Sequence, residues 1–366
     1  MPIEVESPEE MGYNTIKYNL AESSVRDLNW TDLDLNFDEL VLFYGEHRGS
    51  LALREAIIKP SVQLTSNDVL VTAGAATALF IVATTLLSEH DHLVVIRPNY
   101  ATNIETPRAI GCEITFVDLV FGNGYNLDFE QIKNVIQPNT KLISLTVPHN
   151  PTGKVFDQET ILAIIDLATE KGIYVLCDET YRTLNFKSEL KPYLAEISPN
   201  VISVASLSKA YGVPGIRIGW IICQDQTLMN QFLAAKEQIM ICNSVLDEAV
   251  ALSVFEKENE LLTKHHQAIK VNFEIVKNWL NHHPKLAWNE PDAGVVGFVK
   301  VKDELAFDAS IFHQLLREKH QTIVGPGHWF EQNDRYFRIG FGYPTIEELK
   351  QGLANIDLIL AEIDLF

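Results

Sequence analysis

The stretch VISVASLSKAYGVPGIRIGWIIC, residues 201–223, decides the fold and points to the chemistry of this chain. Its two ends, VISVAS (201–206) and IRIGWIIC (216–223), are short apolar runs rich in β-branched residues, which is typical of buried β-strands. Between them Lys209 lies among small residues, ahead of a Gly- and Pro-rich turn. A lysine buried at such a strand end has a lowered pKa and becomes nucleophilic, whereas an exposed one is only a surface charge.

Five similar runs precede this stretch, and amphipathic segments separate them. Several runs are apolar throughout, which suits strands that are covered on both faces. The segment QETILAIIDLATEKG (158–172) is a typical helix that ends in a glycine suited to a C-cap. The alternation predicts an α/β domain with a mostly parallel seven-stranded sheet. The five runs are VLVT (69–72), HLVVI (92–96), EITFV (113–117), KLISL (141–145) and IYVLC (173–177).

The pattern changes after about residue 260. The sequence there predicts a smaller α+β domain, because helices and short strands alternate less regularly. Its expected elements are a helix at 260–283, a strand at 295–301, a helix at 309–320, two short strands and a helix at 345–363. We therefore expect an N-terminal arm or part of the small domain at 1–40, a large domain at 41–260 and a small C-terminal domain at 261–366.

Composition excludes several classes of function. The 366 residues are 46% hydrophobic and 21% charged, as in an average globular protein. Lys and Arg number 29 and Asp and Glu number 49, which gives a formal charge of −20. A surface this acidic repels phosphate backbones, so we expect no nucleic-acid partner.

The cysteines and the N-terminus predict a cytoplasmic protein. Cys112, Cys177, Cys223 and Cys242 form no C-x-x-C pair, so we expect reduced, buried thiols and neither a disulfide framework nor a zinc cluster. The adjacent His pairs at 265–266 and 282–283 lack metal-ligand spacing, and we expect no metal. The first residues, MPIEVESPEE, are acidic and lack the apolar core of a signal peptide.

One uncharged stretch, Val69 to Ser88, is long enough to cross a bilayer. Asp68 and Glu89 flank it, and neither end has a basic anchor. Gly74 also divides a β-branched run from an Ala- and Leu-rich one. We therefore predict a strand, a turn and a buried helix, and no membrane span.

Unusual residues follow the expected strands, at the sheet edge where α/β proteins bind ligands. After the run at 69–72, Gly74, Ala75 and Ala76 open a helix whose backbone N–H groups can approach an anion, although such a turn alone is weak as a signal. After the run at 141–145, the sequence PHNPTG (148–153) fixes Asn150 on a stiff loop between two prolines. Taken alone this is an ordinary turn, and His149 within it is interpreted as loop filler.

Two more strands end in polar residues. Asp178, Glu179 and Tyr181 follow the run at 173–177, and an aspartate there needs a cationic partner if it is buried. Around Lys209, the side chains of Ser206, Ser208 and Arg217 are candidate phosphate ligands. Pyridoxal 5′-phosphate (PLP) requires a lysine, an acid for its pyridine nitrogen, an anion cradle and donors for its ring oxygen, so these features together fit that cofactor.

The motifs PHNPTG, CDETY and SLSKAYGVPGIRIGW, in this order and spacing, resemble the class I/II aminotransferases, the fold-type-I PLP enzymes, over nearly the whole chain. The resemblance implies PLP as the cofactor and transamination between an L-amino acid and a 2-oxo acid by a ping-pong mechanism. It implies that Lys209 forms the aldimine and moves the substrate proton, and that Asp178 pairs with the pyridine nitrogen. Asn150 and Tyr181 would bind the ring oxygen, and Tyr100 would stack on the ring.

The same resemblance assigns the remaining site residues. The phosphate would lie against the backbone of Ala75 and Ala76 and the side chains of Ser206, Ser208 and Arg217. Tyr44, in YGEHRGSLALR, matches a tyrosine that reaches the phosphate of the neighbouring subunit, so the resemblance implies a homodimer. Arg338, in FRIGFG, matches the arginine that binds the substrate α-carboxylate.

One segment departs from the family. Most members have a glycine-containing segment over the substrate, whereas this chain has NLAESSV (19–25), which places Glu22 and Ser23 there. These side chains suggest a polar or cationic substrate, or else belong to a solvated arm. This segment, YGEHRGS and the Lys209 motif also resemble capreomycidine synthases, which use PLP to eliminate and cyclise a hydroxylated arginine.

Three functions therefore stay open from the sequence. Transamination is favoured, PLP-dependent elimination, replacement or cyclisation is the alternative, and a PLP-binding sensor without activity is the remote one. The exact amino acid, the 2-oxo acid and the pathway are not specified, because no second arginine for a distal carboxylate can be placed.

Overall fold

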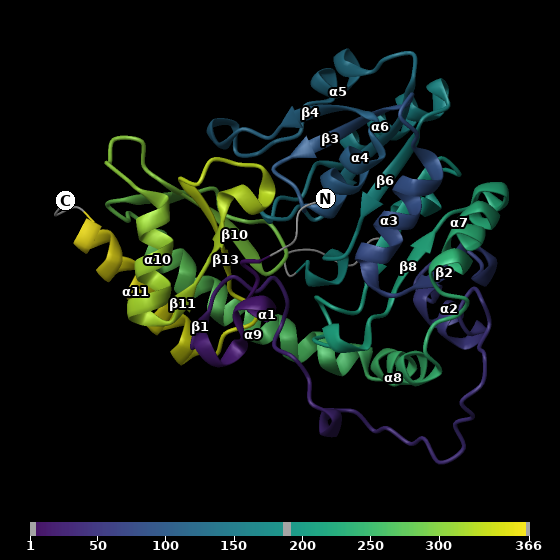
Figure 1. The fold of residues 1–366 in the computed structure, drawn as a ribbon, viewed down its shortest axis with the longest axis horizontal. Coiled ribbons are helices and arrows are strands. Elements are labelled where there is room, and N and C mark those ends of the chain that lie inside the picture. The colour runs from purple at the N-terminus through teal and green to yellow at the C-terminus, as the bar shows by residue number, and fades with distance from the viewer. Residues whose placement is uncertain (1–4, 186–191, 364–366) are drawn as a thin grey trace.

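The computed structural model describes residues 5–185 and 192–363. The described chain forms a larger and a smaller lobe, which we call the large and small domains, and the N-terminal segment and a long helix connect them (Figure 1). The large domain is built on a seven-stranded sheet with the order β2-β8-β7-β6-β5-β3-β4. All its strands run parallel except β8, which is antiparallel to β2 and β7. The strands are β2 (Val69–Thr72), β3 (His92–Arg97), β4 (Glu113–Asp118), β5 (Thr140–Thr146), β6 (Tyr174–Asp178), β7 (Val201–Ser206) and β8 (Gly219–Ile222). The predicted fold class, with seven strands at the expected places, is confirmed.

Helices cover both faces of this sheet, which explains why its strands are apolar throughout. Alternate residues of one strand enter two separate cores: Val94 and Ile96 pack in one, and Leu93 and Val95 in the other. The helices are α2 (Leu51–Ile58), α3 (Gly74–Leu86), α4 (Thr102–Ile110), α5 (Phe129–Val135), α6 (Gln158–Lys171), α7 (Gln226–Ile239) and α8 (Val245–Glu256). The predicted cap of α6 is confirmed, because Gly172 ends it with a φ of 66°.

The uncharged stretch from Val69 folds as β2, a turn at Gly74 and the buried helix α3, as predicted. Within residues 5–185 and 192–363, no helix combines the length and the apolar character that a membrane crossing requires.

The small domain contains a four-stranded antiparallel sheet with the order β12-β13-β10-β9. The strand and helices expected at 295–301, 309–320 and 345–363 are present, and the long helix begins two residues earlier than expected. Where two short strands were predicted after α10, the structure has three, β11, β12 and β13, and a further strand, β9, precedes β10. Their bounds are α9 (Glu258–Leu280), β9 (Leu286–Trp288), β10 (Val296–Val301), α10 (Ala309–His320), β11 (Thr322–Ile323), β12 (Gly325–Pro326), β13 (Tyr336–Gly340) and α11 (Ile346–Ile363).

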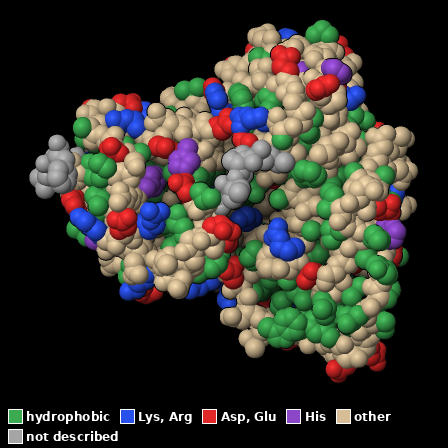
Figure 2. All heavy atoms as spheres, in the orientation of Figure 1, with side chains coloured by type: hydrophobic (Ala, Val, Ile, Leu, Met, Phe, Trp, Pro, Cys, Tyr) green, Lys and Arg blue, Asp and Glu red, His purple; other side chains and the backbone are tan. Residues whose placement is uncertain are grey.

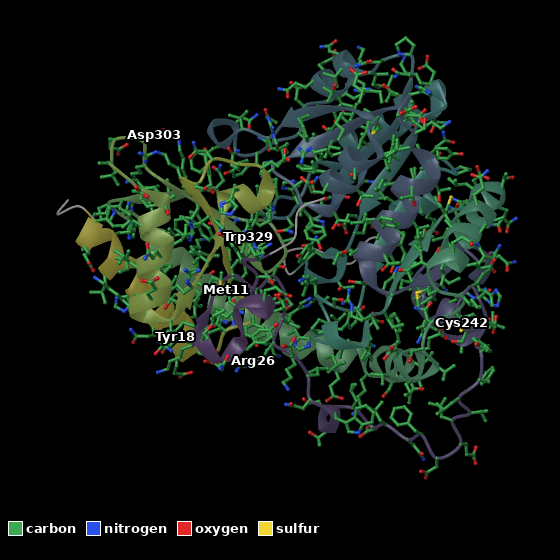
Figure 3. The ribbon with its side chains drawn as sticks, viewed as in Figure 1. Met11, Tyr18, Arg26, Cys242, Asp303 and Trp329 are labelled. Carbon is green, nitrogen blue, oxygen red and sulfur yellow. The ribbon has the colours of Figure 1, made fainter. Side chains whose placement is uncertain are left out.

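The N-terminal segment packs on the small domain before it crosses to the large one. After helix α1 (Pro8–Met11), strand β1 (Tyr18–Asn19) pairs in parallel with β11. Met11 lies near Trp329, in a small apolar cluster between the segment and the small domain (Figure 3). The chain then reaches the loop after β7, where the Val25 N–H donates to the Lys209 carbonyl at 2.9 Å. The domain boundaries expected at residues 40 and 260 stay predictions.

Candidate active site

Lys209 lies three residues after β7, on the loop that returns through β8. Its ammonium nitrogen is 3.4 Å from Oε1 of Glu22, and 30% of its side chain is exposed. Burial lowers the pKa of Lys209, but the carboxylate of Glu22, helped by Tyr181, outweighs burial, and the pKa is raised above its usual value. In this arrangement, without cofactor, Lys209 is therefore a cation that is held by Glu22.

Asp178 is the last residue of β6 and is buried next to the lysine loop. The backbone N–H and the hydroxyl of Thr180 donate to its Oδ1 at 3.1 and 2.6 Å. No described residue donates to Oδ2, which leaves that oxygen available to a ligand. Burial raises the pKa of Asp178, and the Thr180 bonds and the charge of Lys209 oppose that rise. A cation or an N–H group that meets Oδ2 would favour the ionised form further.

Arg338 and Asn150 join the two domains at the site. Arg338, on β13, donates from Nη1 to Oδ1 of Asn150 at 3.0 Å and from Nη2 to the Ala21 carbonyl at 2.6 Å. Its guanidinium also lies over the ring of Phe330, 4.8 Å from the centroid. Three chain segments that are far apart in the sequence thus fix the direction of this arginine.

The N-terminus of α3 forms a cradle bounded by two glycines. No side chain caps this helix start. A Cβ at Gly74 would lie 2.5 Å from Nη2 of Arg217, and a Cβ at Gly219 would lie 2.6 Å from the Ala75 nitrogen. Arg217 Nη1 is 3.4 Å from the Ser208 hydroxyl oxygen, and the Ser206 hydroxyl oxygen accepts from the Ser208 N–H at 3.4 Å. Open N–H groups, hydroxyls and a guanidinium here suit a phosphate.

The N-terminal segment forms the opposite side of the site. Glu22 accepts from the Ser23 N–H at 2.9 Å as well as from Lys209. Burial raises the pKa of Glu22, but Lys209, the Ser23 N–H and Arg338 reverse that effect, and its pKa is lowered. Burial raises the pKa of the Tyr181 hydroxyl, and the charge of Lys209 and the Ser23 side chain oppose that rise.

Tyr100 lies at the mouth of the site, and a residue that the sequence analysis missed holds its loop. Tyr100 is 37% exposed and close enough to Lys209 to influence its charge. The fully buried Asn99 accepts through Oδ1 from the Tyr100 N–H at 2.7 Å, from Asn103 at 3.1 Å and from Thr146 at 3.1 Å. Asn99 directly follows the strand β3 and Pro98, so the strand-end rule that selected Asp178 could have selected it too.

Tyr44 is the one predicted site residue that this chain does not bring to the others. Its side chain is 79% exposed on the loop before α2. The residues just after it are firmly held: Lys236 donates to the His47 carbonyl at 2.6 Å, and Glu248 accepts from the Ser50 N–H at 2.9 Å.

His149 is buried beside Thr152 and Phe156, and burial lowers its pKa to about 3, so it packs the loop as a neutral ring.

The geometry fits PLP on two independent observations. The α3 cradle has space only while residues 74 and 219 lack a Cβ, and it gathers donors for a dianion. Oδ2 of the buried Asp178 has no described partner, as an acid reserved for a protonated ring nitrogen requires. Among the residues that the structure describes, no three His, Cys, Asp or Glu side chains gather to hold a metal ion.

The chain is similar to known proteins over most of its length. Residues 21–356 match the model of the family described as aminotransferase class I and II. Capreomycidine synthase of Streptomyces vinaceus is 29% identical over 87% of this chain and 81% of its own, and an arginine–pyruvate transaminase of Pseudomonas aeruginosa is 26% identical over 87% and 83%. The structure of a PLP-dependent aminotransferase from Streptococcus suis superposes with a TM-score of 0.89 and 29% identity, over 96% of this chain and 95% of its own.

Family model, fold and cradle agree on the cofactor. The match begins within the N-terminal segment and ends within α11, so it includes Glu22, the strand-end cluster and Arg338. The chain therefore belongs to the aminotransferase class I and II family, and its cofactor is pyridoxal 5′-phosphate.

Proposed function

We propose that this protein is an aminotransferase that moves the amino group of an L-amino acid to a 2-oxo acid in two half-reactions. The observation that carries the proposal is that Lys209, Asp178, Asn150 and Arg338 lie together at one site, where Arg338 donates a hydrogen bond to Asn150. A base, an acid partner for the cofactor ring and a carboxylate-binding arginine are what transamination requires of the protein.

Each residue has a defined task. Bound PLP supplies an electron sink for the negative charge that develops at the substrate Cα. Lys209 would hold the aldehyde carbon of the cofactor in the resting enzyme, and its freed amine would take the proton from the substrate Cα and deliver it to that cofactor carbon. Asp178 would keep the ring nitrogen protonated, and Asn150 and Tyr181 would donate to the ring oxygen. Tyr100 would stack on the ring.

The phosphate and the substrate are bound at opposite ends. The phosphate dianion would be held by the backbone of Ala75 and Ala76 and by the side chains of Ser206, Ser208 and Arg217. Arg338 binds the substrate α-carboxylate through its planar guanidinium, which requires it to exchange its bond to Asn150 or Ala21 for two parallel bonds to the substrate. Approach of the small domain would exclude water from the Cα.

Glu22 favours a substrate with a cationic side chain. In the cofactor-free arrangement its carboxylate is balanced by Lys209 at 3.4 Å. With Lys209 attached to the cofactor that free ammonium group would be lost, and Arg338 alone would remain of the two cations that lower the pKa of Glu22, so a further cation would stabilise this mostly buried carboxylate. A guanidinium or ammonium at the end of the substrate supplies one, and Ser23 adds a polar contact.

This same residue favours a second candidate reaction. Capreomycidine synthase and arginine–pyruvate transaminase differ in reaction type, as their names state, yet both match this chain over 87% of its length. An enzyme that eliminates or cyclises a hydroxylated, guanidinium-bearing amino acid would use the same Lys209, Asp178 and Arg338. Only the fate of the amino group differs.

An absorbance screen separates the two reactions. The PLP-loaded protein is mixed with one amino acid at a time, including arginine and 3-hydroxyarginine. The absorption spectrum of the bound cofactor is then recorded over time. Stoichiometric and lasting conversion to the amine form of the cofactor, with release of a 2-oxo acid, supports transamination. A transient change with recovery of the starting spectrum, and either release of ammonia or a product lighter than the substrate by one water, supports elimination or cyclisation and contradicts the main proposal.

We also propose that the protein works as a homodimer in which Tyr44 reaches the phosphate of the other subunit. Figure 2 shows hydrophobic side chains gathered at the lower right, the region in which Figure 1 places α8 and the loop before α2. Exposed apolar residues from this region are Val41, Leu42, Phe43, Leu51 and Leu246. If Tyr44 completes the neighbouring site, Tyr44→Phe weakens PLP binding about tenfold by removing one hydrogen bond to a charged group. Unchanged PLP affinity, or full activity in a monomer verified by sedimentation, contradicts this.

A further inference from the structure

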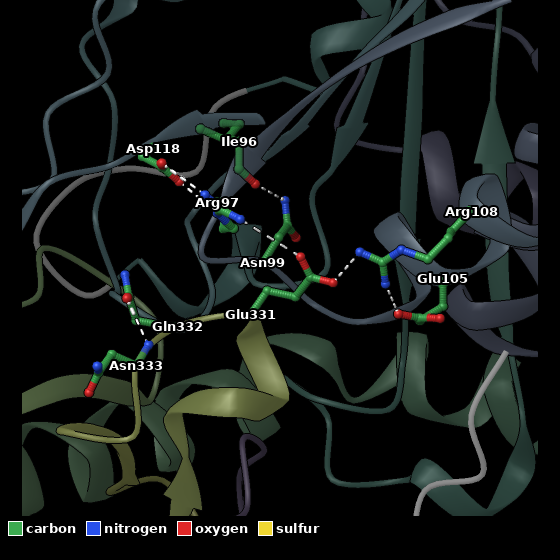
Figure 4. A network of polar contacts seen from close by, with 9 residues as sticks. All are labelled: Ile96, Arg97, Asn99, Glu105, Arg108, Asp118, Glu331, Gln332 and Asn333. Atoms are coloured by element: carbon green, nitrogen blue, oxygen red, sulfur yellow. Dashed lines mark hydrogen bonds and ion pairs between the residues drawn. The ribbon is translucent and has the colours of Figure 1, made fainter. Parts of the chain in front are cut away.

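A group of charges away from the reacting atoms joins the two domains through one small-domain residue, Glu331. Helix η8 (Gly327–Phe330) ends at Glu331, which has a φ of 54°. Its carboxylate meets two arginines of the large domain: Oε1 contacts Nη2 of Arg108, on α4, and Oε2 lies 4.0 Å from Nη1 of Arg97, at the end of β3 (Figure 4). We call Arg97, Arg108 and Glu331 the clasp.

Contacts within the large domain hold both arginines of the clasp independently of Glu331. Asp118, the last residue of β4, binds Arg97 through two parallel bonds of 2.6 and 2.9 Å, and Glu105 binds Arg108. The Arg97 guanidinium also lies 4.7 Å from the centroid of Phe116. These contacts fix the directions of both guanidinium groups, although Asp118 and Glu105 also balance their charge. Glu331 therefore meets two arginines that are already oriented and that lose little further side-chain entropy when they bind it.

The residue that precedes Glu331 in the chain leads directly to the substrate site. Phe330, the preceding residue, lies under Arg338 and accepts through its carbonyl from the Asn99 N–H at 3.3 Å. Asn99 in turn holds the Tyr100 N–H. A single backbone hydrogen bond next to the clasp therefore joins Phe330, which packs against Arg338, to Asn99, which holds the Tyr100 loop.

We propose that Glu331 is a positioning residue that holds the small domain at the distance at which Arg338 and the Tyr100 loop contact one substrate together. The proposal rests on the proposed role of Arg338 but not on the type of reaction. Loss of the clasp leaves the PLP cradle and Lys209 untouched, because neither contacts these residues. It lowers the affinity for the amino acid, since its carboxylate and its Cα are bound from different domains.

The variant is Glu331→Gln, which keeps the shape and removes the charge. Glu362→Gln is the matched control, because Glu362 pairs with Lys319 within the small domain. The probe that needs no substrate is hydrogen exchange of the PLP-loaded protein, followed in peptides that contain Asn99 and Tyr100. We expect their amides to exchange about three- to tenfold faster in Glu331→Gln and unchanged in Glu362→Gln, as loss of one partly exposed ion pair predicts.

The kinetic readout uses whichever amino acid converts the cofactor in the absorbance screen. Glu331→Gln should raise its KM about three- to tenfold with a smaller change in kcat, and should change the PLP dissociation constant less than the KM, because the phosphate cradle is untouched. The difference in KM from the parent protein should shrink as salt is raised toward about 0.5 M, where such pairs are screened. Glu331→Asp, which keeps the charge, should recover part of the affinity. Unchanged exchange at Asn99 and Tyr100 overturns the clasp, whereas faster exchange with an unchanged KM overturns its link to the substrate. Failure of transamination itself alters neither reading.

Discussion

The two sides of the candidate site are built in different ways. The cofactor side comes from strand ends of one sheet: Asp178 ends β6, Lys209 follows β7, and Asn150 follows β5. The substrate side comes from β13 and from residues 19–25, which are held there by backbone bonds and by close packing. A Cβ at Gly340 would lie 1.8 Å from the Glu22 carbonyl oxygen. The cofactor side thus depends on the core of a domain, and the substrate side on how a segment lies on another domain.

This difference suggests where a family keeps its chemistry and where a chain can change its substrate. Strand ends cannot move without disturbing two buried cores. Within residues 19–25, Leu20 and Val25 pack in the large apolar core, whereas Glu22 contacts Lys209 in the site. A change of substrate can therefore be confined to Glu22 and Ser23, while the rest of the segment keeps its packing.

The largest expected effect comes from the residue at which the two sides meet. Lys209→Ala removes both the base and the partner of Glu22, so turnover should fall by about 10³-fold or more. The measurements are product formation and the absorbance of bound PLP, which should resemble the free aldehyde. Turnover near that of the parent protein would refute the assignment of Lys209, and with it the view that both sides serve one reaction.

A matched pair of glycine substitutions tests the two sides separately. Gly219→Ala places a Cβ 2.5 Å from a backbone carbon of the α3 cradle, and Gly340→Ala places one against the Glu22 carbonyl. We expect the first to weaken PLP binding about tenfold and the second to raise the substrate KM about tenfold, each with a stability loss of about 1–3 kcal/mol from overpacking.

The control for this pair is Gly122→Ala, because a Cβ there meets no atom within 4 Å. PLP affinity is measured by equilibrium titration and unfolding by thermal melts, so that a general loss of stability is recognised in both. Equal effects of the two substitutions on PLP and substrate would show that the two sides form one unit, contrary to the comparison.

How well each side could be predicted follows the same division. Asp178, Asn150 and Lys209 could be found because apolar runs mark strands and a parallel sheet brings their ends together. The contact of Arg338 with Asn150 spans 188 positions, and no local pattern encodes it. Strand β9 has three residues, too few for an alternation to be recognised. Glu331 owes its place to a left-handed backbone after a short helix, which leaves no periodic signal.

The smallest effect we predict concerns the charge that links the two sides. Glu22 raises the pKa of Lys209 against the opposing effect of burial, and Lys209 lowers the pKa of Glu22. In Glu22→Gln the strongest influence opposing burial is removed, so the pKa of Lys209 falls and more of its amine is neutral at pH 7. Only the neutral amine can attack the aldehyde, so the cofactor-free variant should capture PLP several-fold faster at neutral pH, with its pH midpoint shifted downward.

Stability should show the opposite sign in the same variant. A raised lysine pKa and a lowered glutamate pKa both mean that the ion pair stabilises the folded, cofactor-free protein only while both groups are charged. The advantage of the parent protein over Glu22→Gln should therefore be present from roughly pH 5 to pH 10 and disappear beyond either limit. Melting temperatures of the two proteins across this range measure it, with PLP-loaded samples as the control. Because loading consumes the free ammonium of Lys209, the difference in melting temperature should shrink or reverse in the PLP-loaded samples. An equal difference with and without PLP would mean that Glu22 stabilises its own segment rather than pairing with Lys209. The substrate side would then be independent of the cofactor side.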